Sequence, residues 1–251
     1  MSTISVQKNN GATYAGTLPK LYRDSIIGLG TRGMFDFATT YGNDGGAIAL
    51  SKQFTNLVDG GLPAIVTDIA GLSQTTGGIK STNSTGKIQL PDAFKLEAGI
   101  SNFMFICWFK RVSGAPNIVG FNLPSTPYTA QWGIDTISTN NISAAVDSNA
   151  LGLWVPIGSV MQVAVEYLAN GATSKSRMYI NGVLSVENTY NNSGSLDIPA
   201  GVNPRIFNAG GATSAAEVNV YRVLLDDLTV SGRTGASLAA ADYEKNKTRF
   251  V

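Results

Sequence analysis

Residues 103–111, FMFICWFKR, are the stretch of sequence that decides the fold. Their first seven side chains are all apolar, whereas a strand with one wet face alternates apolar and polar residues. Because successive side chains of a strand point to opposite faces, an unbroken apolar run suits a strand that is covered on both faces. We therefore predict that these residues form a central strand, with Trp108 in the core.

Short apolar or alternating runs lie on both sides of this stretch, separated by turn-forming residues. They cover residues 34–38, 47–50, 64–70, 87–90, 117–121, 129–134, 142–146, 160–168, 176–186, 204–210 and 218–230. Large side chains recur at every second position from Met161 to Tyr167, which indicates a strand with one buried face. Many short strands with frequent turn signals predict an all-β fold, a two-sheet antiparallel sandwich.

The dipeptide Asn181–Gly182 lies between the runs MYI and VLSV. A type I′ turn needs positive φ at both of its central residues, and Asn-Gly is the pair that adopts this conformation most readily. We therefore predict a tight hairpin at this position.

The two ends of the chain differ from the middle. Residues 1–33 are rich in Gly and show little apolar periodicity, so we expect an extended N-terminal arm; a frayed tail and an arm that docks on a partner both fit this composition. The basic side chains of this arm are Lys8, Lys20, Arg23 and Arg32. Near the other end, Ser237 is expected to cap a short C-terminal helix. Residues 34–251 then form one sandwich, the alternative being a small separate domain that ends near Gly86.

The composition of the 251-residue chain argues against several functions. The chain has no His, which is the usual general base and the commonest metal ligand, and Cys107 is its single Cys. The formal net charge of +1 leaves no basic excess for a nucleic-acid partner. The N-terminal residues lack the pattern of a secretory signal, and no apolar run is long enough for a membrane span. We expect a protein made in a cytoplasm that is not an enzyme and does not insert into membranes.

Several of these segments, taken in chain order, resemble the laminin G-like branch of the concanavalin A-like jelly rolls. The residues that carry the resemblance are Trp108, Tyr179, Asn181, Gly182, Phe207, Asp226, Asp227 and Leu238. The resemblance covers about residues 34–251 and implies a two-sheet jelly roll, but no particular activity. With a neutral surface rich in Ser, Thr and Asn, the chain is also similar to lectin-like sandwiches in bacteriophage head, neck and tail proteins.

Acidic residues are the candidates for catalytic groups and for metal ligands. A glucanase of this fold would need paired carboxylates on one strand, and Glu166 has no acidic neighbour at that spacing. Asp226 and Asp227 are adjacent in a predicted strand and would therefore point to opposite faces. One of them could bind Ca²⁺, although a solvent-facing acid beside an acid that bonds a loop backbone is the favoured interpretation. We expect no cofactor.

Aromatic side chains are the candidates for stacking on a sugar. Trp132 and Trp154 border turn-rich segments and, together with Tyr128 and Tyr190, could present a ring to a glycan. For the two tryptophans a place in the core is the favoured interpretation.

Two functions follow as hypotheses. The first is a bacteriophage virion structural protein, in the head, neck or tail, whose arm binds other virion proteins and copies of itself. The alternative is a carbohydrate-binding module that recognises host-surface glycans. Hydrolysis of glycans is the least favoured of the functions considered, because the paired carboxylates are missing.

Overall fold

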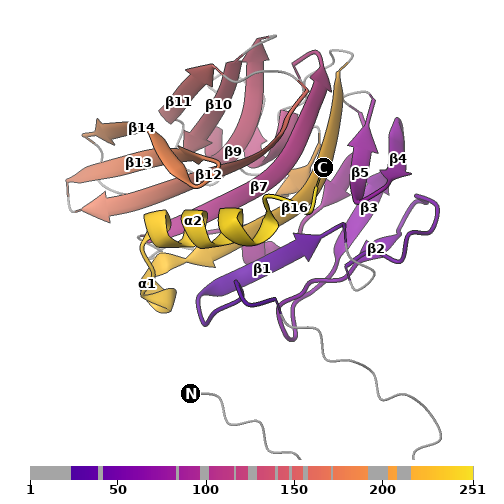
Figure 1. Ribbon diagram of the computed structural model, residues 1–251, viewed down its shortest axis with the longest axis horizontal. Coiled ribbons are helices and arrows are strands. Elements are labelled where there is room, and N and C mark those ends of the chain that lie inside the picture. Colours follow the sequence, from indigo (N-terminus) through magenta and orange to yellow (C-terminus); the bar gives the residue numbers. More distant parts are fainter. Residues whose placement is uncertain are drawn as a thin grey trace, which may run out of the picture.

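The computed structural model describes most of the chain from residue 24 onward. The described residues are 24–38, 42–82, 85–96, 102–115, 117–123, 129–138, 141–146, 149–154, 158–170, 172–191, 203–207 and 216–250. Two antiparallel sheets make up the fold, which confirms the predicted all-β sandwich (Figure 1). Among the described residues, no helix is both long enough and apolar enough to cross a membrane.

The first sheet runs in the spatial order β14-β13-β12-β7-β16-β5-β4, and β1 pairs with the second half of β16. Its strands are β1 (Thr31–Asp36), β4 (Leu72–Thr75), β5 (Gly78–Ser81), β7 (Asn102–Ser113), β12 (Val160–Asn170), β13 (Thr173–Ile180), β14 (Val183–Tyr190) and β16 (Glu217–Asp227). The predicted central strand is β7, which lies between β12 and β16, so this prediction is confirmed.

The second sheet runs in the order β11-β10-β9-β8-β15-β6-β3-β2. Its strands are β2 (Gln53–Phe54), β3 (Ala64–Asp68), β6 (Lys87–Gln89), β8 (Asn117–Leu123), β9 (Thr129–Ser138), β10 (Asn141–Val146), β11 (Asn149–Trp154) and β15 (Arg205–Ile206). The described helical elements are η1 (Asp92–Phe94), α1 (Leu228–Ser231) and α2 (Gly235–Asn246).

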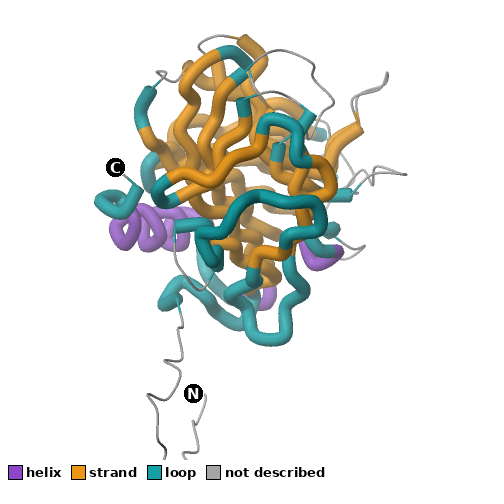
Figure 2. The backbone as a smooth tube through the Cα atoms, turned by 90° about the vertical axis from the view of Figure 1, so that its right-hand side faces the viewer, coloured by secondary structure: helices purple, strands orange, loops and turns teal. Residues whose placement is uncertain are grey.

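Strand β7 is apolar at nearly every position because it has a core on each face. Phe103, Phe105 and Phe109 belong to the larger core between the two sheets. Ile106 and Trp108 point to the outer face of the first sheet, where helix α2 covers them. Figure 1 shows α2 lying across this outer face, and Figure 2 shows it outside the layers of strands. The run is therefore apolar throughout because one face of β7 packs against the second sheet and the other packs against α2.

The N-terminal part of the fold differs from the sequence expectations. The expected arm, residues 1–33, overlaps the sandwich from residue 24, because Asp24 and Ile26 are buried and β1 begins at Thr31. A separate domain ending near Gly86 is wrong, since the strands before that residue pair into both sheets. The run at residues 47–50 is not a strand.

The C-terminal boundaries also differ from the prediction. The strand expected over residues 218–230 ends at Asp227, whose carboxylate caps α1 by accepting hydrogen bonds from two backbone N–H groups. Helix α2 begins after Thr234 rather than at Ser237, and the Thr234 hydroxyl accepts from the Ser237 backbone N–H at 3.2 Å. A Thr three residues upstream thus supplies the cap that was assigned to Ser237.

Candidate functional site

A hollow of about 390 Å³ opens on the outer face of the first sheet beside α2. Strands β7 and β16, the start of β12, the β13–β14 turn and the C-terminal segment all contribute to its lining. The lining combines four aromatic rings with hydroxyl, amide and ammonium groups. The aromatic members are Trp108, Tyr221, Tyr243 and Phe250, and the polar members with side-chain donors are Thr76, Lys110, Ser159, Asn181 and Lys247.

The four aromatic rings pack on one another as a continuous wall. Trp108 and Tyr243 stack with centroids 5.8 Å apart and planes 6° from parallel. Phe250 packs against both Trp108 (5.2 Å) and Tyr221 (5.3 Å). Tyr243 is partly exposed, whereas the other three rings are largely buried. The wall is therefore fixed from behind, and Tyr243 is its most accessible ring.

Side-chain hydrogen bonds hold helix α2 and the β13–β14 hairpin in place around the hollow. The Gln162 amide donates to the Ala239 carbonyl and to Asp242, both at 2.9 Å, and its oxygen accepts from the Gly182 backbone N–H at 2.8 Å. Asn181 has φ of 52° and Gly182 of 80°, which confirms the predicted turn with two positive φ angles.

A buried ionic cluster lies next to this wall. The Arg222 guanidinium pairs with Asp24 and Asp36 at 2.9 Å and with Asp242 at 3.0 Å, and all four side chains are fully buried. Burial alone would raise the pKa of Asp24, but the charge and hydrogen bond of Arg222, with a further bond from Lys245, lower it to about 2. Asp242 also accepts from the Trp108 indole at 2.6 Å. The cluster therefore anchors both the N-terminal segment and the aromatic wall.

Glu166, the candidate for a catalytic carboxylate, is held by hydrogen bonds within the fold. It is buried and accepts hydrogen bonds from the Tyr179 hydroxyl at 2.6 Å and the Gly235 backbone N–H at 3.1 Å. Arg177 lies 3.4 Å from the same carboxylate. Burial and the bond to Glu166 raise the pKa of the Tyr179 phenol well above its ordinary value. This arrangement fixes the start of α2 and keeps the phenol protonated.

Trp132, one of the aromatic residues suggested for stacking on a sugar, lies in the core, which confirms the favoured interpretation of this residue. Trp132 is 1% exposed, stacks on Phe105 at 4.3 Å and donates to the Phe94 carbonyl at 2.9 Å. Its ring therefore cannot receive a sugar, because β9 turns it into the core between the sheets. Trp154 ends β11, but its side chain lies outside the described part of the structure, as does all of Tyr128.

Of the basic residues assigned to the arm, Arg32 is described and Lys8, Lys20 and Arg23 lie outside the described residues. Arg32 lies in β1 and pairs with Asp227 at 3.0 Å. This cation is thus engaged within the fold.

The acidic pair at the end of β16 is held within the protein. Asp226 is buried and accepts from the Thr31 hydroxyl at 2.9 Å and from Arg233. Asp227 bonds the backbone of α1, as predicted, but the predicted solvent-facing acid is wrong because both carboxylates are buried. Within the described residues no cluster of three or more acidic, Cys or His side chains could hold a metal ion.

The sequence does not predict that the residues of this hollow lie together. Lys110 follows the apolar run at residues 103–109, and no pattern in the sequence connects it with Tyr243. A signal for Lys110 existed, since it follows Trp108 by two positions and so lies on the same face of β7.

Comparisons with known proteins show the fold. No family model matches the chain, and no curated protein matches it. Among solved structures, it is similar to Trypanosoma rangeli sialidase, with 12% identity and a TM-score of 0.59 over 89% of this chain and 34% of that one. The same sialidase in complex with sialic acid aligns equally well, covering 90% of this chain. The binding domain of botulinum neurotoxin DC, in complex with rat synaptotagmin II, aligns at 13% identity and a TM-score of 0.51, covering 79% of this chain and 50% of that one.

These similarities define a class of fold, the two-sheet β-sandwich. The chain spans about a third of the length of the sialidases it matches. The prediction that the chain is not an enzyme is contradicted, because sialidases are enzymes that carry this fold over part of their length. At 12% identity the likeness shows the fold alone, so no activity passes to this chain.

Proposed function

We propose that the chain is a carbohydrate-binding module and that the hollow beside α2 receives a sugar ring. The observation that carries this proposal is the aromatic wall, with the partly exposed ring of Tyr243, in a hollow of about 390 Å³ that also offers hydroxyl, amide and ammonium donors. This volume falls within the range of ordinary ligand sites, about 300–1,000 Å³.

A sugar ring has the chemistry that this lining matches. Its C–H groups form apolar patches that pack on aromatic rings, and its rim of hydroxyl groups exchanges hydrogen bonds with polar side chains. Ser159 and Asn181 supply such groups at the edge of the wall. Because Trp108 supports Tyr243 from behind, the ring that would receive the sugar is already ordered, which lowers the entropic cost of binding.

The similarity to a sialidase solved with sialic acid supports the carbohydrate-binding alternative through the fold alone. The solved structures named above are sialidases and a neurotoxin binding domain rather than virion proteins, so they favour this alternative over the virion hypothesis. Assembly into a virion, and a location there, stay predictions.

A panel of immobilised neutral and acidic oligosaccharides tests the proposal. Tyr243→Ala should weaken retention of the bound oligosaccharide about tenfold. Tyr190→Ala is the matched control, because Tyr190 is also partly exposed but lies in β14 away from the lining of the hollow. Retention by Tyr190→Ala should equal that of the parent protein.

A second variant guards against loss of folding in Tyr243→Ala. Ser159 is exposed and lines the hollow, so Ser159→Trp should fill it without disturbing a buried contact. We expect an unchanged melting temperature and loss of retention. Failure of the parent protein to retain any oligosaccharide of the panel would refute the proposed function.

A further inference from the structure

We propose that the hollow selects an anionic saccharide, a sugar that carries a carboxylate or a sulfate group. This inference rests on the proposed function and names the class of its ligand. Its first support is the charge of the lining: the described residues that form it include the ammonium groups of Lys110 and Lys247, and none of them carries a carboxylate. In a chain with 18 basic and 17 acidic residues, two cations without an acid in one hollow are a local excess of positive charge.

Of the two lysines, Lys110 gives the stronger support for an anionic ligand. It is partly buried on the outer face of β7, where its cross-strand neighbours are Val160 and Asn219. Among the described residues, no ion pair or hydrogen bond engages its ammonium group. By contrast, Lys80, on the same sheet, pairs with Glu217 at 2.7 Å. A partly buried ammonium that has no counter-ion among the described residues is a group that an anionic ligand would satisfy.

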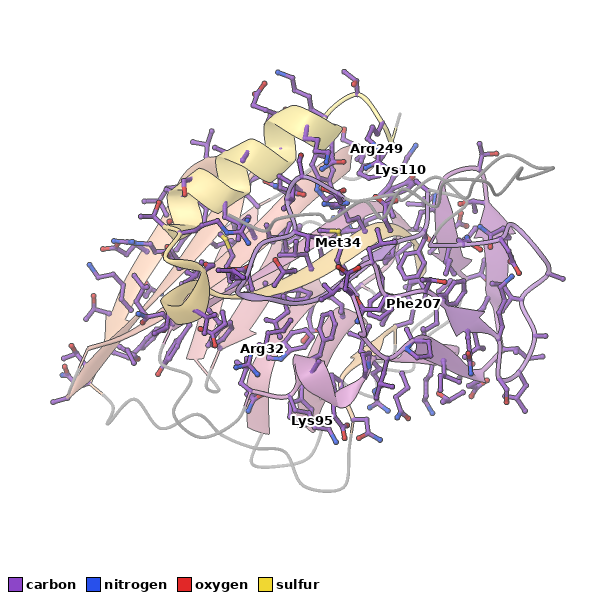
Figure 3. All side chains as sticks on the ribbon, turned by 90° about the horizontal axis from the view of Figure 1, so that it is seen from below. Arg32, Met34, Lys95, Lys110, Phe207 and Arg249 are labelled. Atoms are coloured by element: carbon purple, nitrogen blue, oxygen red, sulfur yellow. The ribbon has the colours of Figure 1, made fainter. Side chains whose placement is uncertain are left out.

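Lys247 is free to turn toward such a ligand. Its present partner is Glu244, one turn away along the chain, and both side chains are substantially exposed. An exposed ion pair of this kind contributes little, so exchanging Glu244 for a ligand anion costs little. Arg249 packs on the lining residue Phe250, with its guanidinium carbon 5.0 Å from the ring centroid, and Figure 3 labels both Arg249 and Lys110. Its guanidinium is engaged by Asp36 at 2.9 Å, so we assign the anion to the two lysines.

The aromatic wall and the two lysines together specify the ligand. A simple inorganic anion would use the charge but not the rings, and a neutral sugar would use the rings but leave Lys110 unpaired. A sugar with an anionic substituent satisfies both parts of the lining. Because electrostatic attraction is screened by salt, its preference over a neutral sugar should shrink as the ionic strength rises.

Titration calorimetry with three oligosaccharides of equal length tests the inference: one ending in glucuronic acid, one in 6-sulfated glucose and one in glucose. We expect at least one acidic form to bind about tenfold tighter than the neutral form at low salt. Lys110→Gln should remove most of that preference, because it takes away the positive charge and keeps a side chain that can still donate a hydrogen bond to any of the three forms. Lys87→Gln is the matched control, because Lys87 is also partly buried and without a partner among the described residues, but lies in the second sheet.

The outcomes separate this inference from the proposed function. Equal affinity for the three forms, or a preference that survives in Lys110→Gln, overturns the inference and leaves the carbohydrate-binding function in place. Absence of binding by all three forms and by the wider panel overturns both. A tenfold preference that Lys110→Gln abolishes supports the inference, and the tighter of the two acidic forms identifies the anionic group.

Discussion

Replacing Arg222 by methionine leaves three buried carboxylates around an uncharged side chain of similar length. Asp24 keeps Lys245, Asp36 keeps Arg249, and Asp242 keeps its hydrogen bonds from Trp108 and Gln162, but their shared buried cation is gone. Removing one partner of a buried ion pair costs about 3–5 kcal/mol of the free energy of unfolding. We expect Arg222→Met to lose this amount at neutral pH.

Urea denaturation of the parent protein and of Arg222→Met at several pH values measures the loss in the free energy of unfolding. The folded-state pKa of Asp24 is about 2, below its ordinary 3.8, so this carboxylate contributes stability above about pH 4 and loses it as the pH falls toward 2. The shift corresponds to about 2 kcal/mol. In the variant the carboxylate lacks the Arg222 charge that lowers its pKa, so acid removes less stability from it. The gap between parent and variant should therefore narrow as the pH falls from about 4 toward 2.

Arg32→Met is the control for this experiment, because Arg32 forms a single, partly exposed pair with Asp227. Arg32→Met should lower the free energy of unfolding by less than about 1 kcal/mol. The reasoning that buried, mutually compensating charges hold the Arg222 cluster has two results that would refute it. One is a loss below about 1 kcal/mol for Arg222→Met, and the other is a difference in stability between parent and variant that does not change with pH.

Three further substitutions test the fold around the site by denaturation. Phe105→Ala removes a ring that stacks on Trp132 at 4.3 Å in the core and should cost about 3–5 kcal/mol; a cost below 1 would contradict its central place. Gly182→Ala puts a methyl group 3.1 Å from the Tyr243 Cβ at φ of 80° and should cost about 1–3 kcal/mol, whereas a neutral effect would mean that the turn can relax. Thr234→Ala removes the cap of α2 and should cost about 1 kcal/mol; an equal loss from Ser237→Ala would contradict the assignment of the cap.

The sequence predicted the parts of the fold whose signal is local. The run at residues 103–111 identified β7, because a strand between two cores loses its alternation whatever its neighbours are. Asn181–Gly182 identified the hairpin, because the backbone conformation of that turn selects those residues directly. Trp132 borders turn residues, which allowed an exposed ring, but the core was the favoured interpretation, and the pairing of β9 with its neighbours turns the ring inward.

The site could not be predicted because its members come from distant parts of the chain. Trp108 and Tyr243 are 135 positions apart, and only the packing of α2 on the outer face of the first sheet brings them together. The burial of Asp24 could not be predicted for the same reason. Nothing near it in sequence indicates burial, and the reason for its burial is Arg222, almost 200 positions later.

Asp242 links the stability of the fold to the candidate ligand site. One of its oxygens accepts from Trp108 and Gln162, which position the aromatic wall and the hairpin, and the other accepts from Arg222, which holds the N-terminal segment. The rings that would receive a sugar are thus oriented by a carboxylate whose own charge is compensated by the buried cluster. It follows that Arg222→Met, at a residue that is not itself part of the lining, should weaken saccharide binding as well as folding, because both effects pass through Asp242.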